Sequence, residues 1–286
     1  MRRTTSRLPR HLSLSFAVLC ALLLLPASAA AQGGKGKGKK PPPPPPQGQP
    51  QQPAAAPAPA PAEPPPPAVG TVDRKLREHR TAEARAAIDA VAGQAEQNAH
   101  VAVALGRVLE QEQRYGDAAA RLQRAAQLAP ADPAPHVYLG EVYLRQRNGG
   151  QADAAFRRAA ELAQAGGGGR EKDYYLGVAQ QRLRQFDQAV AAFERARGAD
   201  GGNALVPYQI GVTRAFQEQW GAAVEQLDRA IAMDSGLAYA YYYRGLAAEK
   251  LGRKDLLIND LERFLALAPN APEAERAKAI LRAVKR

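Results

Sequence analysis

The residues 99–132, AHVAVALGRVLEQEQRYGDAAARLQRAAQLAPAD, decide how this chain folds. They divide into two segments that carry small and apolar side chains at helical spacing. In the second segment these are Ala118, Leu122 and Ala125, and the spacing i, i+4, i+7 places them on one face of a helix. Gly106 in the first segment lets the second helix approach closely. The stretch predicts two helices joined as a hairpin.

The same pattern returns along the chain at a nearly constant period. Five glycines mark it, and their sequence numbers rise in steps of 34, 37, 34 and 34: Gly106, Gly140, Gly177, Gly211 and Gly245. Alignment on them gives the units 99–132, 133–166, 170–203, 204–237 and 238–271, with residues 167–169 inserted between the second and third. One hairpin cannot bury its apolar face alone, so a period of this length predicts a stack of hairpins.

The repeated residues resemble those of the tetratricopeptide repeat. The family's Leu-Gly pair stands at Leu105-Gly106, Leu139-Gly140 and Leu176-Gly177, with Ile210-Gly211 similar. Its small, large, small triplet stands at Ala118/Leu122/Ala125, Ala152/Phe156/Ala159, Ala189/Phe193/Ala196 and Ala223/Leu227/Ala230. The resemblance implies an all-α fold, a right-handed superhelical solenoid of antiparallel helix hairpins with about five units.

The fifth unit, 238–271, departs from the pattern. Arg244-Gly245 keeps only the glycine of the pair, and Leu257, Leu261 and Phe264 replace the triplet. Two large residues in place of alanines should make the packing of this hairpin looser or shifted. Its length and Pro269, at the position of the family's closing proline, keep it in register.

Both ends of the stack have their own pattern. Residues 71–98 place Ala84, Ile88 and Val91 where a triplet would stand, so they predict a degenerate or half repeat. Residues 272–286 predict a capping helix, because a solenoid needs a half-polar element over its last apolar face. The stripe of this helix comprises Ala277, Ile280, Leu281 and Val284.

The first third of the chain has a different composition. Residues 1–31 combine four arginines, an apolar run from Leu12 to Leu25 and small residues after Pro26, the layout of a secretory signal peptide. Cys20, the single cysteine, lies inside this run. Residues 32–70 are rich in Lys, Gly and Pro and predict a disordered linker. We therefore expect export, to the periplasm or out of the cell.

Two alternatives follow from these residues. If the signal stays uncleaved, Leu12 to Ala31 is about long enough to span a bilayer and would anchor a structural envelope component. Such a component could also rest on cell-wall polymer through its Lys- and Pro-rich arm. Cleavage, in contrast, leaves no integral membrane span.

The charge distribution argues against nucleic acid as a partner. The formal net charge is +11, but residues 71–286 contain 31 basic and 27 acidic residues, a net charge of +4. Most of the excess basic charge belongs to residues 1–70. The repeats therefore lack the strongly basic character of nucleic-acid-binding domains.

The sequence offers no pattern for catalytic, cofactor-binding or metal sites. After cleavage the histidines are His79, His100 and His136, and none stands at a ligand spacing such as H-x-x-x-H. Residues 33–40, GGKGKGKK, approach a phosphate-binding loop, but Lys40 stands where Ser or Thr is needed. We expect a protein that is not an enzyme and needs no cofactor.

Tyrosines identify the candidate binding surface. Nine of the ten tyrosines fall on predicted first helices of repeats, and such helices line the concave surface of tetratricopeptide arrays. The predicted partner-binding residues are Tyr138, Tyr174, Tyr208, Tyr242, Arg145, Arg182, Phe216 and Lys250. Tyr and Arg often anchor binding, since each joins a broad contact area to a directed polar group.

Two interpretations of these tyrosines remain open, binding and hairpin packing, the latter especially for Tyr143 and Tyr241. The binding interpretation predicts a scaffold or adaptor that holds a protein or peptide with acidic groups in its groove. The family's carboxylate clamp is not predicted, because the ninth positions of the units carry no Asn. The sequence does not specify the partner's identity or the oligomeric state.

Overall fold

The computed structural model describes residues 65–198 and 203–285. The predicted signal peptide and nearly all of the predicted linker lie outside these residues. The described part is helical throughout, with no strand. Its elements are α1 (Pro67–Arg77), α2 (Thr81–Asp89), the 3₁₀ helix η1 (Ala92–Glu96), α3 (Ala99–Gln111), α4 (Tyr115–Leu128), α5 (Ala134–Arg145), α6 (Gly149–Ala165), α7 (Arg170–Arg182), α8 (Phe186–Arg197), α9 (Leu205–Phe216), α10 (Trp220–Met233), α11 (Ala238–Lys250), α12 (Lys254–Leu267) and α13 (Ala274–Val284).

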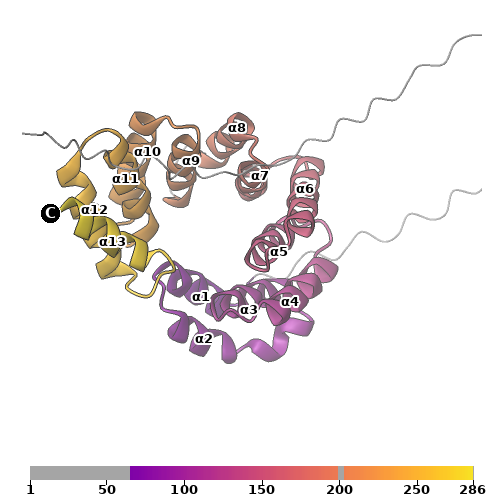
Figure 1. Cartoon of the computed structure of the whole chain (residues 1–286). Helices are drawn as coiled ribbons and strands as arrows, with labels where there is room; N and C mark the ends of the chain where they lie inside the picture. Colours follow the sequence, from indigo (N-terminus) through magenta and orange to yellow (C-terminus); the bar gives the residue numbers. More distant parts are fainter. Residues whose placement is uncertain (1–64, 199–202, 286) are drawn as a thin grey trace, which may run out of the picture. The chain divides into compact units, whose positions relative to one another are not determined.

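The helices pair in chain order and the pairs stack. Each odd-numbered helix from α3 to α11 packs on the next helix to form a hairpin, and each hairpin packs on its neighbours. Successive first helices also contact one another, α3 with α5, α5 with α7, α7 with α9 and α9 with α11. Within residues 65–285 these first helices lie on the inside of the curve and their partners on the outside (Figure 1). The predicted all-α tetratricopeptide solenoid is confirmed.

The repeat glycines sit where the two helices of a hairpin cross. A Cβ added at Gly140 would lie 2.5 Å from a ring carbon of Phe156, and one at Gly106 would lie 2.7 Å from Leu122 Cγ. Gly177 and Gly211 would meet their large residues at 2.6 Å. Real Cβ atoms do not come this close, so the large residue of each triplet occupies the space that a missing side chain leaves.

The turns inside the hairpins repeat as regularly as the glycines do. Each has one residue in the left-handed region, with φ between 60° and 72°: Gln113, Arg147, Arg184, Glu218 and Gly252. They follow the repeat glycines by seven positions and share their spacing. Four of the five carry a side chain, which costs roughly 1–2 kcal/mol in this conformation compared with glycine.

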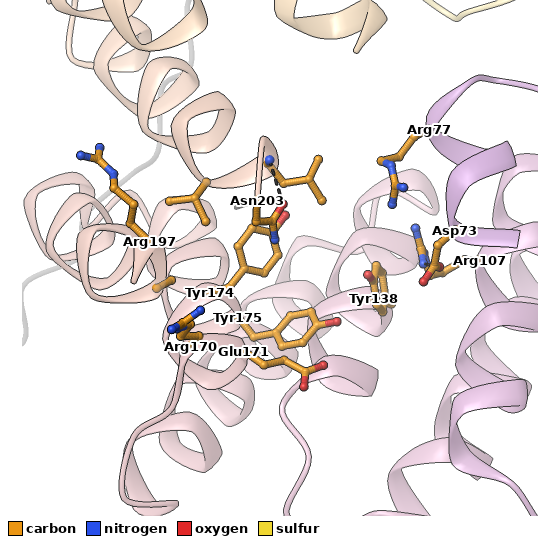
Figure 2. A pocket seen from close by; sticks show the side chains of 13 residues that line it. Asp73, Arg77, Arg107, Tyr138, Arg170, Glu171, Tyr174, Tyr175, Arg197 and Asn203 are labelled. Atoms are coloured by element: carbon orange, nitrogen blue, oxygen red, sulfur yellow. Dashed lines mark hydrogen bonds and ion pairs between the residues drawn. The ribbon is translucent and has the colours of Figure 1, made fainter. Parts of the chain in front are cut away.

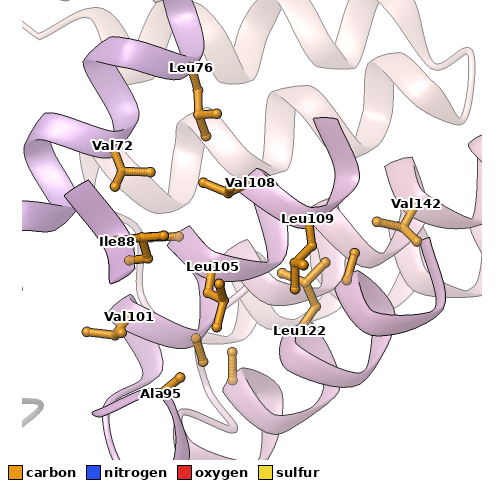
Figure 3. Close-up of a cluster of buried hydrophobic side chains, with 14 of the residues drawn as sticks. Val72, Leu76, Ile88, Ala95, Val101, Leu105, Val108, Leu109, Leu122 and Val142 are labelled. Carbon is orange, nitrogen blue, oxygen red and sulfur yellow. The ribbon is translucent and has the colours of Figure 1, made fainter. Parts of the chain in front are cut away.

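The N-terminal end, where a degenerate or half repeat is predicted over 71–98, is a hairpin of α1 and α2 that lacks the repeat glycine. Helix α1 begins at Pro67, inside the predicted linker, and His79 has φ 54°, in the turn position that Gln113 takes in the next hairpin. Val72 stands in the glycine position and is fully buried, as is Ile88 at the large position (Figure 3). Proline suits the first turn of a helix, so the proline-rich composition hid where α1 begins.

The α11–α12 hairpin, for which the sequence predicts looser or shifted packing, has a different contact at its centre. A Cβ on Gly245 would meet Asp260 Cβ at 3.2 Å and Leu261 only at 3.6 Å. Asp260 is 2% exposed and accepts two hydrogen bonds from Arg244, from Nε at 2.9 Å and from Nη2 at 2.6 Å. Burial raises the pKa of Asp260, and the Arg244 hydrogen bonds oppose that shift. A buried ion pair here replaces the apolar contact of the other hairpins.

The glycine insertion and the C-terminal helix complete the stack. Gly167, Gly168 and Gly169 all have positive φ and separate α6 from α7, yet these two helices still pack on each other. At the other end α13 buries Ala277 and packs Ile280 and Leu281 against the last core. A half-buried helix therefore lies where the capping helix is predicted.

Candidate functional site

The inner surface of the solenoid is built from first helices and carries most of the tyrosines. Tyr138 and Tyr143 lie on α5, Tyr174 and Tyr175 on α7, Tyr208 on α9, and Tyr239, Tyr241, Tyr242 and Tyr243 on α11. The prediction that nine tyrosines fall on first helices is confirmed. Their individual roles differ, because successive residues on a helix point about 100° apart.

Three ion pairs connect successive first helices in the N-terminal half, and we call them the charge ladder. Arg107 on α3 pairs with Asp73 on α1, Arg145 on α5 with Glu110 on α3, and Arg182 on α7 with Glu141 on α5. The Arg182–Glu141 distance is 2.5 Å and the Arg145–Glu110 distance is 3.5 Å. The carboxylate of Glu141 raises the pKa of Arg182, although burial opposes that shift.

A pocket of about 690 Å³ opens beside the charge ladder. In Figure 2, Asp73, Arg77 and Arg107 lie on one side of it, Tyr174 and Tyr175 on the other, and Tyr138 between them. Its lining also includes Arg170, Glu171, Ala196, Arg197, Asn203, Leu205 and Val206. Volumes of this size are typical of ligand sites.

Three tyrosines of the pocket form one aromatic group. The Tyr138 ring lies 6.2 Å from the Tyr175 ring, which lies 5.6 Å from the Tyr174 ring, and both contacts are edge-to-face. The guanidinium of Arg107 stacks over Tyr138 at 4.7 Å from the ring centre. Burial raises the pKa of Tyr174 to about 12 and that of Tyr175 well above its usual value, so both phenols stay neutral at physiological pH.

A second tyrosine group lies in the C-terminal half, on α9 and α11. The ring of Tyr208 lies 6.3 Å from that of Tyr243, which lies 6.4 Å from Tyr239. Burial raises the pKa of both Tyr208 and Tyr243, which keeps these phenols protonated. Within the described residues the hydroxyls of these two have no hydrogen-bond partner and stay accessible to solvent. They can therefore donate to a ligand.

The two ends of the stack meet at Tyr239. Its hydroxyl donates to Glu273, just before α13, and its ring lies 5.1 Å from that of His79, just after α1. Burial lowers the pKa of His79, and the nearby Glu273 opposes that shift. The first hairpin and the last one thus contact each other across the inner surface.

The structure brings together five of the eight predicted partner-binding residues. Tyr138, Tyr174, Tyr208, Arg145 and Arg182 lie on the inner surface. Both arginines are engaged by acids of the preceding first helix, which the prediction of a basic row did not include.

The other three lie elsewhere. Tyr242 is 3% exposed, and its ring centre lies 4.9 Å from that of Phe264. It therefore lies in the core and not in the groove where it was predicted. Phe216 stacks on Phe186 at 6.0 Å beside a turn, and Lys250 is the exposed last residue of α11.

Several inner-surface residues are not among the predicted partner-binding residues. They are Asp73, Arg77, Arg107, Glu110, Glu141, Tyr175, Tyr239 and Tyr243. Opposite charges about one repeat apart, as at Asp73 and Arg107, are the signal that could have revealed the charge ladder. The stacking of first helices brings such positions side by side.

The described residues offer neither a metal site nor a membrane span. Across 65–198 and 203–285, His, Cys, Asp and Glu side chains do not gather into any group able to hold a metal ion. Among the helices of the same residues, none combines the length and the apolar character needed to cross a membrane.

Comparisons with known proteins agree with this geometry. The family model of the tetratricopeptide repeat matches residues 213–282, from the end of α9 through most of α13. Residues 213–282 are tetratricopeptide repeats. No curated protein matches the sequence. Left-handed turn residues recur at the repeat spacing from His79 to Gly252, so the same structural unit is repeated from α1 onward.

Solved tetratricopeptide structures share the fold. A chain of the crystal structure of the APC/C hetero-tetramer Cut9-Hcn1 matches with a TM-score of 0.54 and 17% identity, over 77% of this chain and 42% of that one. TTC0263, a thermophilic tetratricopeptide protein of Thermus thermophilus, matches with a TM-score of 0.52 and 19% identity, over 65% of this chain and 98% of that one. This chain therefore spans less than half the length of the first structure, and identities this low concern the fold alone.

Proposed function

We propose that this tetratricopeptide-repeat protein is a non-enzymatic scaffold that binds a partner polypeptide along its inner surface. The observation that carries the proposal is the pair of phenol groups at Tyr208 and Tyr243, which lack a hydrogen-bond partner among the described residues. Two hydrogen-bond donors on successive first helices, held by ring contacts and accessible to solvent, are suited to bind carbonyl groups of an extended chain.

The length of the inner surface supports the same function. First helices from α3 to α11 contact one another in sequence, so a bound segment would touch several repeats at once. Rigid aromatic side chains provide contact area at a low cost in conformational entropy. The similar Cut9-Hcn1 structure is a hetero-tetramer, an assembly of different chains, which agrees with a scaffold role for this fold.

The cellular setting is part of the proposal and rests on residues 1–31. A cleaved signal peptide would release the scaffold into the periplasm or the medium, with the Lys- and Pro-rich segment ahead of the repeats. N-terminal sequencing of the exported protein tests this. A start near residue 32 is expected, whereas an intact Met1 would contradict release.

The binding function is tested by removing the two phenol hydroxyls. Capture of partner proteins by the full-length chain is compared with capture by a Tyr208→Phe/Tyr243→Phe variant, which keeps both rings and so the packing. A lost hydrogen bond costs about 1 kcal/mol, so each hydroxyl should be worth roughly fivefold in affinity.

The matched control for this test is Tyr241→Phe. Tyr241 also lies on α11, but its ring stacks with Arg244 and Arg263 instead of the second tyrosine group. A partner captured equally by all three proteins would contradict binding at Tyr208 and Tyr243.

A further inference from the structure

We propose that the pocket beside the charge ladder binds a carboxylate of the partner polypeptide, with Arg77 as its charged anchor. The inference rests on the proposed scaffold function and specifies the chemistry of the partner at one end of the inner surface. The pocket has contributions from α1, so it depends on the N-terminal hairpin that the sequence had indicated only in part.

The charges that line the pocket favour an anion. Four arginines and two carboxylates give it a formal charge of +2: Arg77, Arg107, Arg170, Arg197, Asp73 and Glu171. Asp73 is already paired with Arg107, and Arg197 pairs with Glu194 outside the pocket at 2.9 Å. Arg170 also interacts with another residue, so the pocket arginine left to attract an anion is Arg77.

Arg77 is the arginine available to a ligand. It lies in the last turn of α1, is partly buried, and makes neither an ion pair nor a hydrogen bond with any described residue. Figure 2 shows its side chain on the same side of the pocket as Arg107. A guanidinium that is partly removed from water and lacks a partner gains from a carboxylate, which it can bind through two parallel hydrogen bonds.

The tyrosines opposite Arg77 supply hydrogen-bond donors that suit a carboxylate. A carboxylate only accepts hydrogen bonds, and the phenols of Tyr174 and Tyr175 keep their protons. The pocket also adjoins the first turn of α9, which begins at Leu205 and carries no acidic side chain. The N-terminal end of a helix carries partial positive charge, which adds to the attraction for an anion.

Two probe peptides test the proposal. Blocked, fluorescently labelled tetraglutamate and tetraglutamine differ in charge but have the same length. At low salt the full-length chain should bind tetraglutamate at least about tenfold more tightly, which is the worth of one charge-assisted hydrogen bond. The preference should shrink as salt is added, because salt screens the attraction.

The test variant is Arg77→Gln and the matched control is Arg74→Gln, an exposed arginine of the same helix outside the pocket lining. Arg77→Gln should abolish most of the preference for tetraglutamate, and Arg74→Gln should leave it unchanged. Equal losses in both variants would refute a specific anchor and indicate general charge attraction.

A readout on the unaltered protein removes any dependence on how the variants fold. The guanidinium Nε–H signal of Arg77 should shift in NMR spectra as tetraglutamate is added, and tetraglutamine should not move it. An Arg77 signal that stays in place with both peptides would overturn the proposal. Equal binding of both peptides that still depends on Tyr208 and Tyr243 would refute the carboxylate anchor and leave the scaffold function in place.

Discussion

The hairpins α5–α6 and α11–α12 have nearly the same register but different contacts at their centre. In α5–α6, Gly140 receives the ring of Phe156, whereas in α11–α12 the space beside Gly245 holds the Arg244–Asp260 ion pair. Both turns place a left-handed residue seven positions after the glycine, Arg147 and Gly252 respectively. The turn therefore sets the length of the repeat, and the residues at the central contact can be apolar or charged without disrupting the stack.

The largest expected effect comes from breaking the ion pair of α11–α12. Arg244→Met would leave Asp260 buried without its partner, and removing one member of a buried pair costs about 3–5 kcal/mol. Denaturant unfolding of the full chain measures the loss. Arg229→Met, which removes an exposed pair with Glu225, should change the free energy of unfolding by less than about 1 kcal/mol.

A double variant shows whether the charge itself matters. Because apolar residues can replace a buried ion pair, Arg244→Met/Asp260→Leu should be clearly more stable than Arg244→Met alone. A double variant as unstable as the single one would mean that the space beside Gly245 admits only this ion pair.

The next largest effect concerns the glycines. In Gly140→Ala the new Cβ would overlap the Phe156 ring, and overpacking of a core typically costs about 1–3 kcal/mol. In Gly245→Ala the contact of 3.2 Å is milder, so we expect a change below about 1 kcal/mol. Thermal unfolding of both variants compares them directly. Gly150→Ala on α6, where nothing lies within 4 Å, is the control.

Acid should weaken the stack through two histidines, one on α5 and one that packs against α11. Burial lowers the pKa of His136 on α5 and that of His79, which packs on Tyr239 of α11. The unfolded chain then binds protons that the folded chain does not, so stability present above about pH 6.5 is lost as the pH falls below it. The free energy of unfolding is measured between about pH 7.5 and about pH 5.5. It should fall less over this range in the His79→Gln/His136→Gln variant than in the unaltered protein. An identical loss would contradict this role.

The smallest expected effect is a gain in stability at the turn. Arg147→Gly gives α5–α6 the residue that α11–α12 already has at Gly252, and should stabilise the hairpin by roughly 0.5–1 kcal/mol, because glycine avoids the left-handed strain. Gly252→Ala should destabilise by a similar amount. Melting temperatures of the two variants should therefore move in opposite directions, and movement in the same direction would show that the two turns are not equivalent.

Much of the fold could be predicted from residue spacing, since a glycine at a close helix crossing and a large residue sixteen positions later leave a clear pattern. The N-terminal hairpin was only partly predicted, because Val72 replaces the glycine. The residues that line the groove were harder to predict from the sequence. Four of the five residues from Tyr239 to Tyr243 are tyrosines, and a pattern cannot tell which of them faces the core. The charge ladder joins residues up to 41 positions apart, and only the stacked geometry brings them together.

The contact of His79 with Tyr239 has a consequence for the rate of binding. Because the first and last hairpins meet there, we expect a long polypeptide to reach the inner surface either by entering end first or after this contact opens. Association would then be slower than diffusion permits, and a bound chain would leave slowly. Mild acid, which favours a charged His79, should therefore shorten the residence time of a ligand.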